Sequence, residues 1–265
     1  MEKLTVIKVG GKIVEDEATL AQLLKDFSAV EGHKVLVHGG GRSATKIAAQ
    51  LGIESQMVDG RRITDENMLR VVTMVYGGLV NKHIVALLQA DGVNAVGLTG
   101  ADMNILRSHR RPLKKMNVDG EERMIDFGFV GDVDYADGNT LAMLLEQGIT
   151  PVVAPLTHDG EGNILNTNAD TMASETAKAI AQEHDVTLIF SFEKRGVLSN
   201  PDDDNSVIPL ITPELFEHYK ADGTISGGML PKIENAINAL NAGVKKVVIT
   251  LASAINGSDG TVIKL

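Results

Sequence analysis

The chain has no cysteine among its 265 residues, and this absence excludes several kinds of site at once. Without thiols it can form neither disulfide bonds nor thiolate-ligated metal centres. Low-complexity segments and repeats of fixed period are also missing, and we find no Ser-His-Asp set and no metal-ligand spacing. We therefore expect no metal to be held directly by the protein.

A secretory signal pattern is missing at the N-terminus, and we expect no stretch that approaches the length of a membrane span. The net charge of −10 argues against nucleic-acid and anionic-membrane partners. A small anionic ligand remains compatible with this charge, because the field in a site depends on the few nearest charges. These absences predict a cytoplasmic protein with neither a membrane nor a nucleic acid as partner.

Short apolar runs alternate with helical patterns over nearly the whole chain. The runs fit strands buried on both faces, and they read LTVIKV, KVLVH, NAVGL, TPVVAPL, VTLIFSF and KKVVITL. Helices are expected between them, at Glu17–Val30, Ser43–Leu51, Asn139–Gln147, Ala169–Glu183 and Pro231–Ala242. This alternation predicts a single α/β domain over residues 1–265, with a mainly parallel central sheet between two helical layers.

Two segments interrupt this alternation. Thr64–Ala90 is predicted to be one long apolar helix with Thr64 as its N-cap and Gly77-Gly78 midway. A kinked core helix and a subunit interface with closely crossing helices explain this segment equally well. The polar stretch Ile105–Val133 is predicted to form a β-hairpin excursion whose basic residues face solvent.

Two glycine-rich turns follow predicted strands. Lys8 ends the first strand and Gly10-Gly11 come next, so an ammonium group and bare N–H groups lie where open parallel sheets bind ligands. A lysine at a strand end can also simply reach water. The second turn, HGGGRSA, directs N–H groups and a helix dipole at an anion. Its Gly39, Gly41 and Ala44, with Asp59 downstream, also fit a dinucleotide fingerprint, which gives Lys8 no role.

Three further stretches place polar groups near such turns. In DGRRITDE, one arginine can clamp a carboxylate at the mouth of the glycine turn. In NTNAD, Asn166, Asn168 and Asp170 alternate, and helix capping explains only one of them. In SGGMLPK, Lys232 lies in the first turn of a helix, where a cation is unfavourable unless an anion is bound too. Together these groups suit the stabilisation of a transferring phosphoryl group.

Five of these stretches, in this order and spacing, resemble the signatures of the amino acid kinase family. They are KVGGK, VHGGG with GRRIT, FGFVGDV, NTNAD and GGMLPKIENA, and they match best the members that act on N-acetylglutamate. The resemblance implies an open αβα sandwich of the carbamate kinase type. Its N-lobe, about 1–170, would bind the acyl amino acid and form a homodimer, and its C-lobe, about 171–265, would bind ATP.

The resemblance also implies roles for single residues. Lys8 and Lys232 would stabilise the transferring phosphate, and Asp170 would hold both lysines in place. The residues that bind the acylglutamate would be Gly40, Gly41, Arg62 and Asn166. Those that bind the nucleotide would be Gly10, Gly11, Ser191, Gly227, Gly228 and Met229. At Glu193–Gly196 the chain departs from the shorter turn usual in relatives.

The implied reaction is ATP-dependent phosphorylation of the γ-carboxylate of N-acetyl-L-glutamate, a step of arginine biosynthesis, with Mg²⁺ arriving on the nucleotide. N-succinylglutamate and the substrates of other amino acid kinases are alternatives. A non-catalytic amino-acid sensor is an alternative of another class, against which the intact Lys8, Asp170 and Lys232 argue. Because only three residues precede the first strand, we expect a dimer rather than an arginine-inhibited hexamer.

Overall fold

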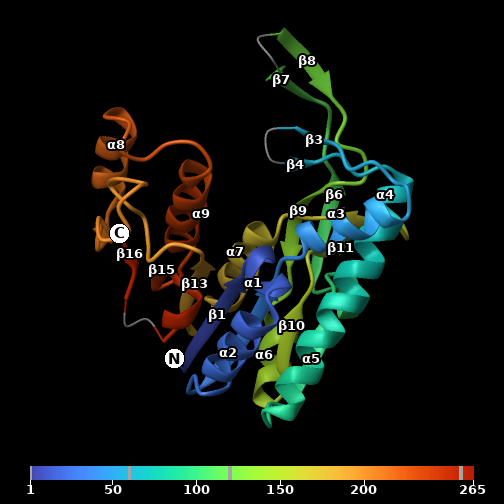
Figure 1. Ribbon diagram of the computed structural model, residues 1–265. Coiled ribbons are helices and arrows are strands. Elements are labelled where there is room, and N and C mark those ends of the chain that lie inside the picture. The colour runs from blue at the N-terminus through green and yellow to red at the C-terminus, as the bar shows by residue number, and fades with distance from the viewer. Residues whose placement is uncertain (1, 59–60, 119–120, 257–258) are drawn as a thin grey trace.

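An eight-stranded sheet runs through the middle of the computed structural model, which describes residues 2–58, 61–118, 121–256 and 259–265 (Figure 1). The strand order is β14-β16-β15-β13-β1-β2-β10-β5, and every neighbouring pair is parallel except β15 and β16. The bounds are β1 Lys3–Val9, β2 His33–His38, β5 Ala95–Leu98, β10 Thr150–Val153, β13 Asp185–Phe192, β14 Leu210–Ile211, β15 Lys246–Leu251 and β16 Thr261–Ile263. The predicted mainly parallel sheet is confirmed.

Alternate strand residues supply two separate hydrophobic cores. Val35 and Val37 of β2 belong to one core, whereas Leu36 between them belongs to the other. The first core is covered by α6 (Gly138–Glu146), α7 (Ala169–Ile180), α8 (Pro213–Ala221) and α9 (Met229–Asn241). The second is covered by α1 (Gly11–Glu15), α2 (Glu17–Ser28), α3 (Gly41–Gln50), α4 (Glu66–Val72), η1 (Thr73–Val80) and α5 (Asn81–Ala90). The predicted αβα sandwich follows from strands that are apolar on both faces.

The segments α4, η1 and α5 form one continuous helix, and η1 is π-helical. The prediction of Thr64 as its N-cap is wrong, because the Asp65 carboxylate accepts the Met68 N–H at 2.8 Å. Thr64 is buried instead, and its backbone pairs with Phe127 and Phe129. Both residue types cap helices well, so the local sequence did not distinguish them.

This helix also corrects the expectation that no stretch approaches the length of a membrane span. Glu66–Ala90 is long and apolar enough, by length and composition alone, to cross a membrane. The buried core helix of a soluble protein passes the same test. Here the helix contributes to the second core, with Val71, Val75 and Ile84 among its buried residues. Gly77 and Gly78 do not interrupt it, and this is why it reaches that length.

A smaller sheet and two hairpins lie beyond the central sheet, and the hairpins project at the top of Figure 1. The small sheet has the order β12-β11-β6-β9, and each hairpin is an antiparallel pair, β3 with β4 and β7 with β8. Their bounds are β3 Met57–Val58, β4 Arg61–Arg62, β6 Leu106–Arg110, β7 Lys114–Val118, β8 Glu121–Ile125, β9 Gly131–Ala136, β11 Leu156–His158 and β12 Ile164–Asn166. The short 3-10 turns are η2 Asp102–Asn104 and η3 Ala252–Ala254. The predicted hairpin excursion is confirmed as two nested antiparallel pairs, β6 with β9 and β7 with β8.

Candidate active site

Two lysines and one aspartate meet at the carboxyl edge of the central sheet. The Lys8 ammonium lies 2.8 Å from Oδ1 of Asp170, and the Lys232 ammonium donates to Oδ2 of Asp170 at 2.5 Å. Lys8 comes from β1, Asp170 from the first turn of α7 and Lys232 from the first residues of α9. The structure thus brings the three residues together from three separate elements, with side chains only 12–21% exposed.

The Asp170 carboxylate of this cluster is ionised at neutral pH. Burial alone raises the pKa of Asp170, but the charges of Lys8 and Lys232 outweigh it and lower that pKa to about 2. Asp170 lies in the first turn of α7, where the Asn168 side chain caps the helix by accepting the N–H groups of Asp170 and Thr171. Two cations around one anion leave a net positive charge at the sheet edge, although the whole chain carries −10.

The two glycine turns lie against each other beside this cluster. A Cβ added to Gly39 would come within 3.0 Å of the Gly11 nitrogen, and one added to Gly11 would lie 3.5 Å from the Gly40 nitrogen. A Cβ on Gly40 would also meet Cδ1 of Tyr76 at 2.9 Å. Only residues without side chains let the turns after β1 and β2 approach this closely.

A cleft of about 450 Å³ opens on one side of the cluster. Its lining includes Gly40, Gly41, Arg62, Asn166, Asp170 and Lys232. The Arg62 guanidinium donates to the Gly41 carbonyl at 2.7 Å and to Thr45 Oγ1 at 2.9 Å, and it also contacts Ser55. The Asn166 amide donates to Thr64 Oγ1 at 3.0 Å. Arginine, amide and backbone N–H groups make this cleft suited to carboxylates.

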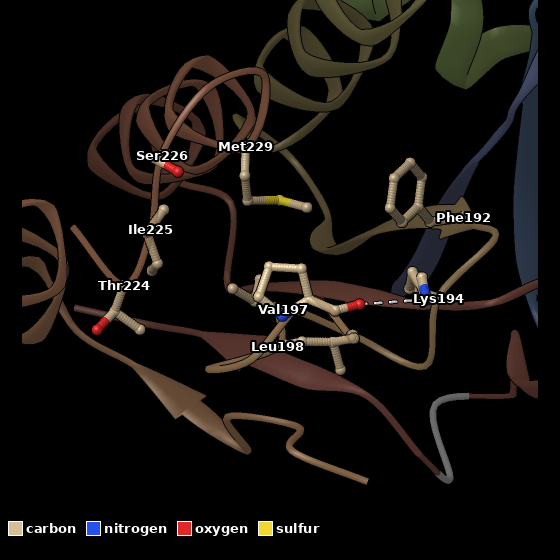
Figure 2. A pocket seen from close by; sticks show the side chains of 10 residues that line it. Phe192, Lys194, Val197, Leu198, Thr224, Ile225, Ser226 and Met229 are labelled. Carbon is tan, nitrogen blue, oxygen red and sulfur yellow. Dashed lines mark hydrogen bonds between the residues drawn. The ribbon is translucent and has the colours of Figure 1, made fainter. Parts of the chain in front are cut away.

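Two further cavities continue the groove on the other side. One of about 280 Å³ is lined by Lys8, Gly10, Gly11, Ser191 and Lys232 among others, and it shares Gly11, Gly41 and Lys232 with the large cleft. The other, of about 130 Å³, shares Phe192 with it and is mostly apolar. Figure 2 shows Val197, Leu198, Ile225 and Met229 around this last cavity. The Lys194 ammonium donates to the Pro201 carbonyl at 3.5 Å. Its walls suit a flat apolar ring system.

The structure places most of the predicted site residues along this groove. Gly228 lines the large cleft and Met229 the apolar cavity, whereas Gly227 lines none of the three cavities. Asp59, which belonged to the dinucleotide alternative, lies outside the described residues. Tyr76 and Arg111 also line the large cleft. Tyr76 was missed, and the prediction that the basic residues of the hairpin face solvent is wrong for Arg111, whose side chain is 14% exposed and pairs with Asp132. The sequence signal for Tyr76 was its polar hydroxyl group within a predicted helix that is mostly apolar.

Within the part of the chain that the structure describes, no group of three or more His, Asp or Glu side chains is arranged to hold a metal ion. Asp170, which lines the large cleft, is paired with two lysines, and Glu193, which lines the next cavity, is paired with Lys12.

Comparisons with known proteins agree with this geometry. The sequence profile described as the amino acid kinase family matches residues 3–251. A protein named acetylglutamate kinase from Bacteroides thetaiotaomicron is 68% identical over 99% of both chains, and one of the same name from Parabacteroides distasonis is 63% identical over 98% of this chain and 99% of that one. Among solved structures, carbamate kinase from Giardia lamblia bound to AMP-PNP shares the fold, with a TM-score of 0.65 and 18% identity over 99% of this chain and 98% of that one.

Proposed function

The chain belongs to the amino acid kinase family, and we propose that it transfers the γ-phosphoryl group of ATP to the γ-carboxylate of N-acetyl-L-glutamate. The product is N-acetylglutamyl 5-phosphate, an acyl phosphate of arginine biosynthesis. The full-length relatives named acetylglutamate kinase support this substrate. One observation carries the proposal: the Lys8–Asp170–Lys232 cluster lies between a cleft suited to carboxylates and a cavity suited to a base.

The cluster suits a reaction that needs charge neutralisation rather than a base. The attacking carboxylate is already ionised at neutral pH, so no proton has to be removed from it. Asp170 is no base in this proposal, because its pKa of about 2 keeps it ionised and paired with the lysines. Lys8 and Lys232 would face the transferring phosphoryl group from two sides and offset the charge that develops on its oxygens.

The acylglutamate would lie in the large cleft. The Arg62 guanidinium is anchored by the Gly41 carbonyl and Thr45, and its planar fork suits one carboxylate of the substrate. Gly40 and Gly41 would offer backbone N–H groups to the other carboxylate or to the phosphoryl group. Asn166, anchored through Thr64, would bind the acylamide. In this assignment, residues of about 1–170 bind the acyl amino acid.

ATP would lie along the other two cavities, with its base in the apolar one. Gly10, Gly11, Ser191 and Gly228 would lie near the phosphates, and Met229 would pack against the base. Gly227 would help only indirectly, by letting the chain turn at a positive φ of 57° just before α9. Mg²⁺ would arrive with the nucleotide and keep phosphate and water oxygens as its ligands. Residues of about 171–265 supply most of this side of the groove.

A homodimer through the long helix is part of the proposal. Met74 and Leu79 of the π-helical segment are 55% and 60% exposed, which leaves large apolar side chains on the exposed face of this helix. Gly78 lies beside them with nothing within 4 Å of the place of a Cβ, so a second helix can approach. We place the dimer in the cytoplasm, without a membrane or nucleic acid as partner. Light scattering should give a molar mass twice that of one chain. The Leu79→Glu variant should have the mass of a single chain.

A coupled assay of ADP release over a panel of acceptors tests the reaction. N-acetyl-L-glutamate should be phosphorylated, and hydroxylamine should trap the acyl phosphate. Glutamate, aspartate and carbamate should give rates at least about a hundredfold lower, because they lack the acylamide or the chain length. N-succinyl-L-glutamate tests the acyl group: a kcat/KM higher than that of the acetyl compound would transfer the proposal to the succinyl substrate. No ADP release with any acceptor would favour a binding protein.

A further inference from the structure

A buried histidine lies directly behind the glycine turn, and the reaction proposed above gives it no role. His38 is the last residue of β2, and its side chain is fully buried. Its Nδ1 lies 2.7 Å from the Gly39 carbonyl oxygen, and its Nε2 lies 3.1 Å from Nδ2 of Asn81. The ring therefore bridges the turn that lines the cleft and the long helix.

The partners of Asn81 determine which ring nitrogen of His38 carries the proton. Lys82, whose ammonium can only donate, hydrogen-bonds Oδ1 of Asn81 at 3.0 Å, and Nδ2 of Asn81 donates to the Val152 carbonyl at 2.9 Å. The amide of Asn81 is thereby oriented with its NH₂ group toward His38. Nε2 of His38 must then accept, and the proton must be on Nδ1, which donates to the Gly39 carbonyl.

This ring stays neutral in the folded protein. Burial lowers the pKa of His38 to about 4, with a further lowering by the charge of Lys82 and an opposing effect of the bond to Gly39. At neutral pH the single Nδ1–H tautomer is thus maintained from both sides, by a donor at Nε2 and an acceptor at Nδ1.

The bond from His38 orients the next peptide group. In a trans peptide the C=O of Gly39 and the N–H of Gly40 point in opposite directions. Because the Gly39 oxygen is held against the buried ring, the Gly40 N–H points away from it. Gly40 lines the large cleft, and no backbone acceptor among the described residues takes its N–H. Three successive glycines would otherwise leave this peptide free to rotate.

The π-helical segment brings a second contact to the same turn. The N–H of Asn81 donates to the carbonyl of Tyr76, five residues earlier, and the Tyr76 ring packs on Gly40. In an α-helix, residues five apart diverge by about 140° around the axis. The wider π turn brings them nearer to one face, so Tyr76 and Asn81 both reach the glycine turn.

We propose that His38 is a positioning residue: its Nδ1–H holds the Gly39–Gly40 peptide so that the Gly40 N–H faces the bound substrate, and Asn81 fixes the tautomer that does so. This inference rests on the proposed function for the identity of the substrate. The same proposal gives the π-helical segment a structural role, because its winding places Tyr76 and Asn81 together next to the glycine turn.

Two matched variants separate this role from mere packing. In His38→Asn the side-chain NH₂ comes near the place of Nδ1 and can keep the bond to Gly39. In His38→Gln the amide comes near the place of Nε2 and keeps only the contact with Asn81. We expect kcat/KM for N-acetyl-L-glutamate within about threefold of wild type for the first, and about ten- to a hundredfold lower for the second, as for one lost backbone donor. The KM for ATP should change less than about twofold in both.

Equal losses in both variants, or the larger loss in His38→Asn, would overturn the inference. Long-range ¹H–¹⁵N spectra of histidine-labelled wild-type protein supply an independent readout, with the His38 signals identified as the set that remains when each of the other six histidines is replaced in turn. A neutral ring protonated at Nδ1 between pH 6 and 8 is expected, and protonation at Nε2 would overturn the inference even if both variants fail to fold. An inactive wild-type protein with the Nδ1–H tautomer would instead count against the proposed function alone.

Discussion

The two ends of the groove differ in almost every physical property. The cleft of about 450 Å³ is lined by guanidinium, amide and backbone polar groups, many of them held by hydrogen bonds to other parts of the chain. The cavity of about 130 Å³ at the other end is lined mostly by aliphatic side chains and Phe192 (Figure 2). Between them lies the ion-paired cluster of Lys8, Asp170 and Lys232.

This difference shows how one sheet edge can bind two substrates of different chemistry. Polar recognition at the large end depends on orientation, because a misplaced donor loses most of its bond energy. Apolar recognition at the small end depends on area and tolerates small shifts. We therefore expect substitutions in the middle to affect kcat, those at the large end to affect the KM for acylglutamate, and those at the small end to affect the KM for ATP.

The largest effect is expected at the lysine cluster. Lys8→Ala and Lys232→Ala should each lower kcat by roughly two or more orders of magnitude, because each removes a charge that faces the transferring phosphoryl group. Lys25→Ala, at an exposed position of α2, is the matched control and should leave kcat unchanged. Steady-state kinetics with both substrates test this prediction. A near-normal kcat in both cluster variants would contradict the proposed mechanism.

A smaller effect is expected at the large end of the groove. Arg62→Lys should raise the KM for N-acetyl-L-glutamate about tenfold, because an ammonium cannot reproduce a two-pronged contact with a carboxylate. The KM for ATP should stay the same, and Arg70→Lys on the exposed side of α4 should change neither constant. If the KM for ATP rises instead, the two ends of the groove are assigned the wrong way round.

At the small end, truncation of one apolar contact should have a modest effect. Met229→Ala should raise the KM for ATP about fivefold, which corresponds to about 1 kcal/mol of lost apolar contact. The KM for acylglutamate should not change. Met143→Ala, at an exposed position of α6, controls for the loss of a methionine elsewhere. An unchanged KM for ATP would contradict the placement of the ATP base in this cavity.

The smallest effect is expected from pH. Asp170, with a pKa lowered to about 2, stays ionised, and His38, with a pKa lowered to about 4, stays neutral, so kcat should vary less than about twofold between pH 6 and 8. A fall of kcat by tenfold below pH 7.5 would indicate a general base.

As the pH falls, the free energy of unfolding should decrease before kcat changes. Neutral His38 stabilises the folded state fully above its unfolded pKa of about 6.5, and this contribution declines as the pH falls toward 4. The contribution of Asp170 is complete above pH 4 and is lost only as the pH falls toward 2. Urea unfolding between pH 7.5 and 4.5 should therefore show a steeper loss of the free energy of unfolding for wild type than for His38→Asn. Equal slopes would mean that His38 titrates normally.

The sequence by itself determined the layers and most of the groove. Apolar runs of strand length between amphipathic helices permit few arrangements other than a parallel sheet covered on both sides. Lysines and glycines that follow such strands lie at one edge, since parallel strands end together. Local signals also predicted a cap at either Asn168 or Asp170, of which the structure uses Asn168, and they placed Lys232 near the start of α9.

Only the tertiary structure decided which of several equivalent local choices was made. Thr64 and Asp65 can both cap a helix; Asp65 does so, whereas the Thr64 hydroxyl accepts a hydrogen bond from Asn166, 102 residues away. The π-helical winding at Thr73–Val80 likewise has no local sequence signal that we identified. It accompanies the packing of Tyr76 on Gly40 and the bond of Asn81 to His38, contacts between segments more than 30 residues apart. Long-range contacts of this kind select among local conformations of similar energy, and a single sequence does not reveal their partners.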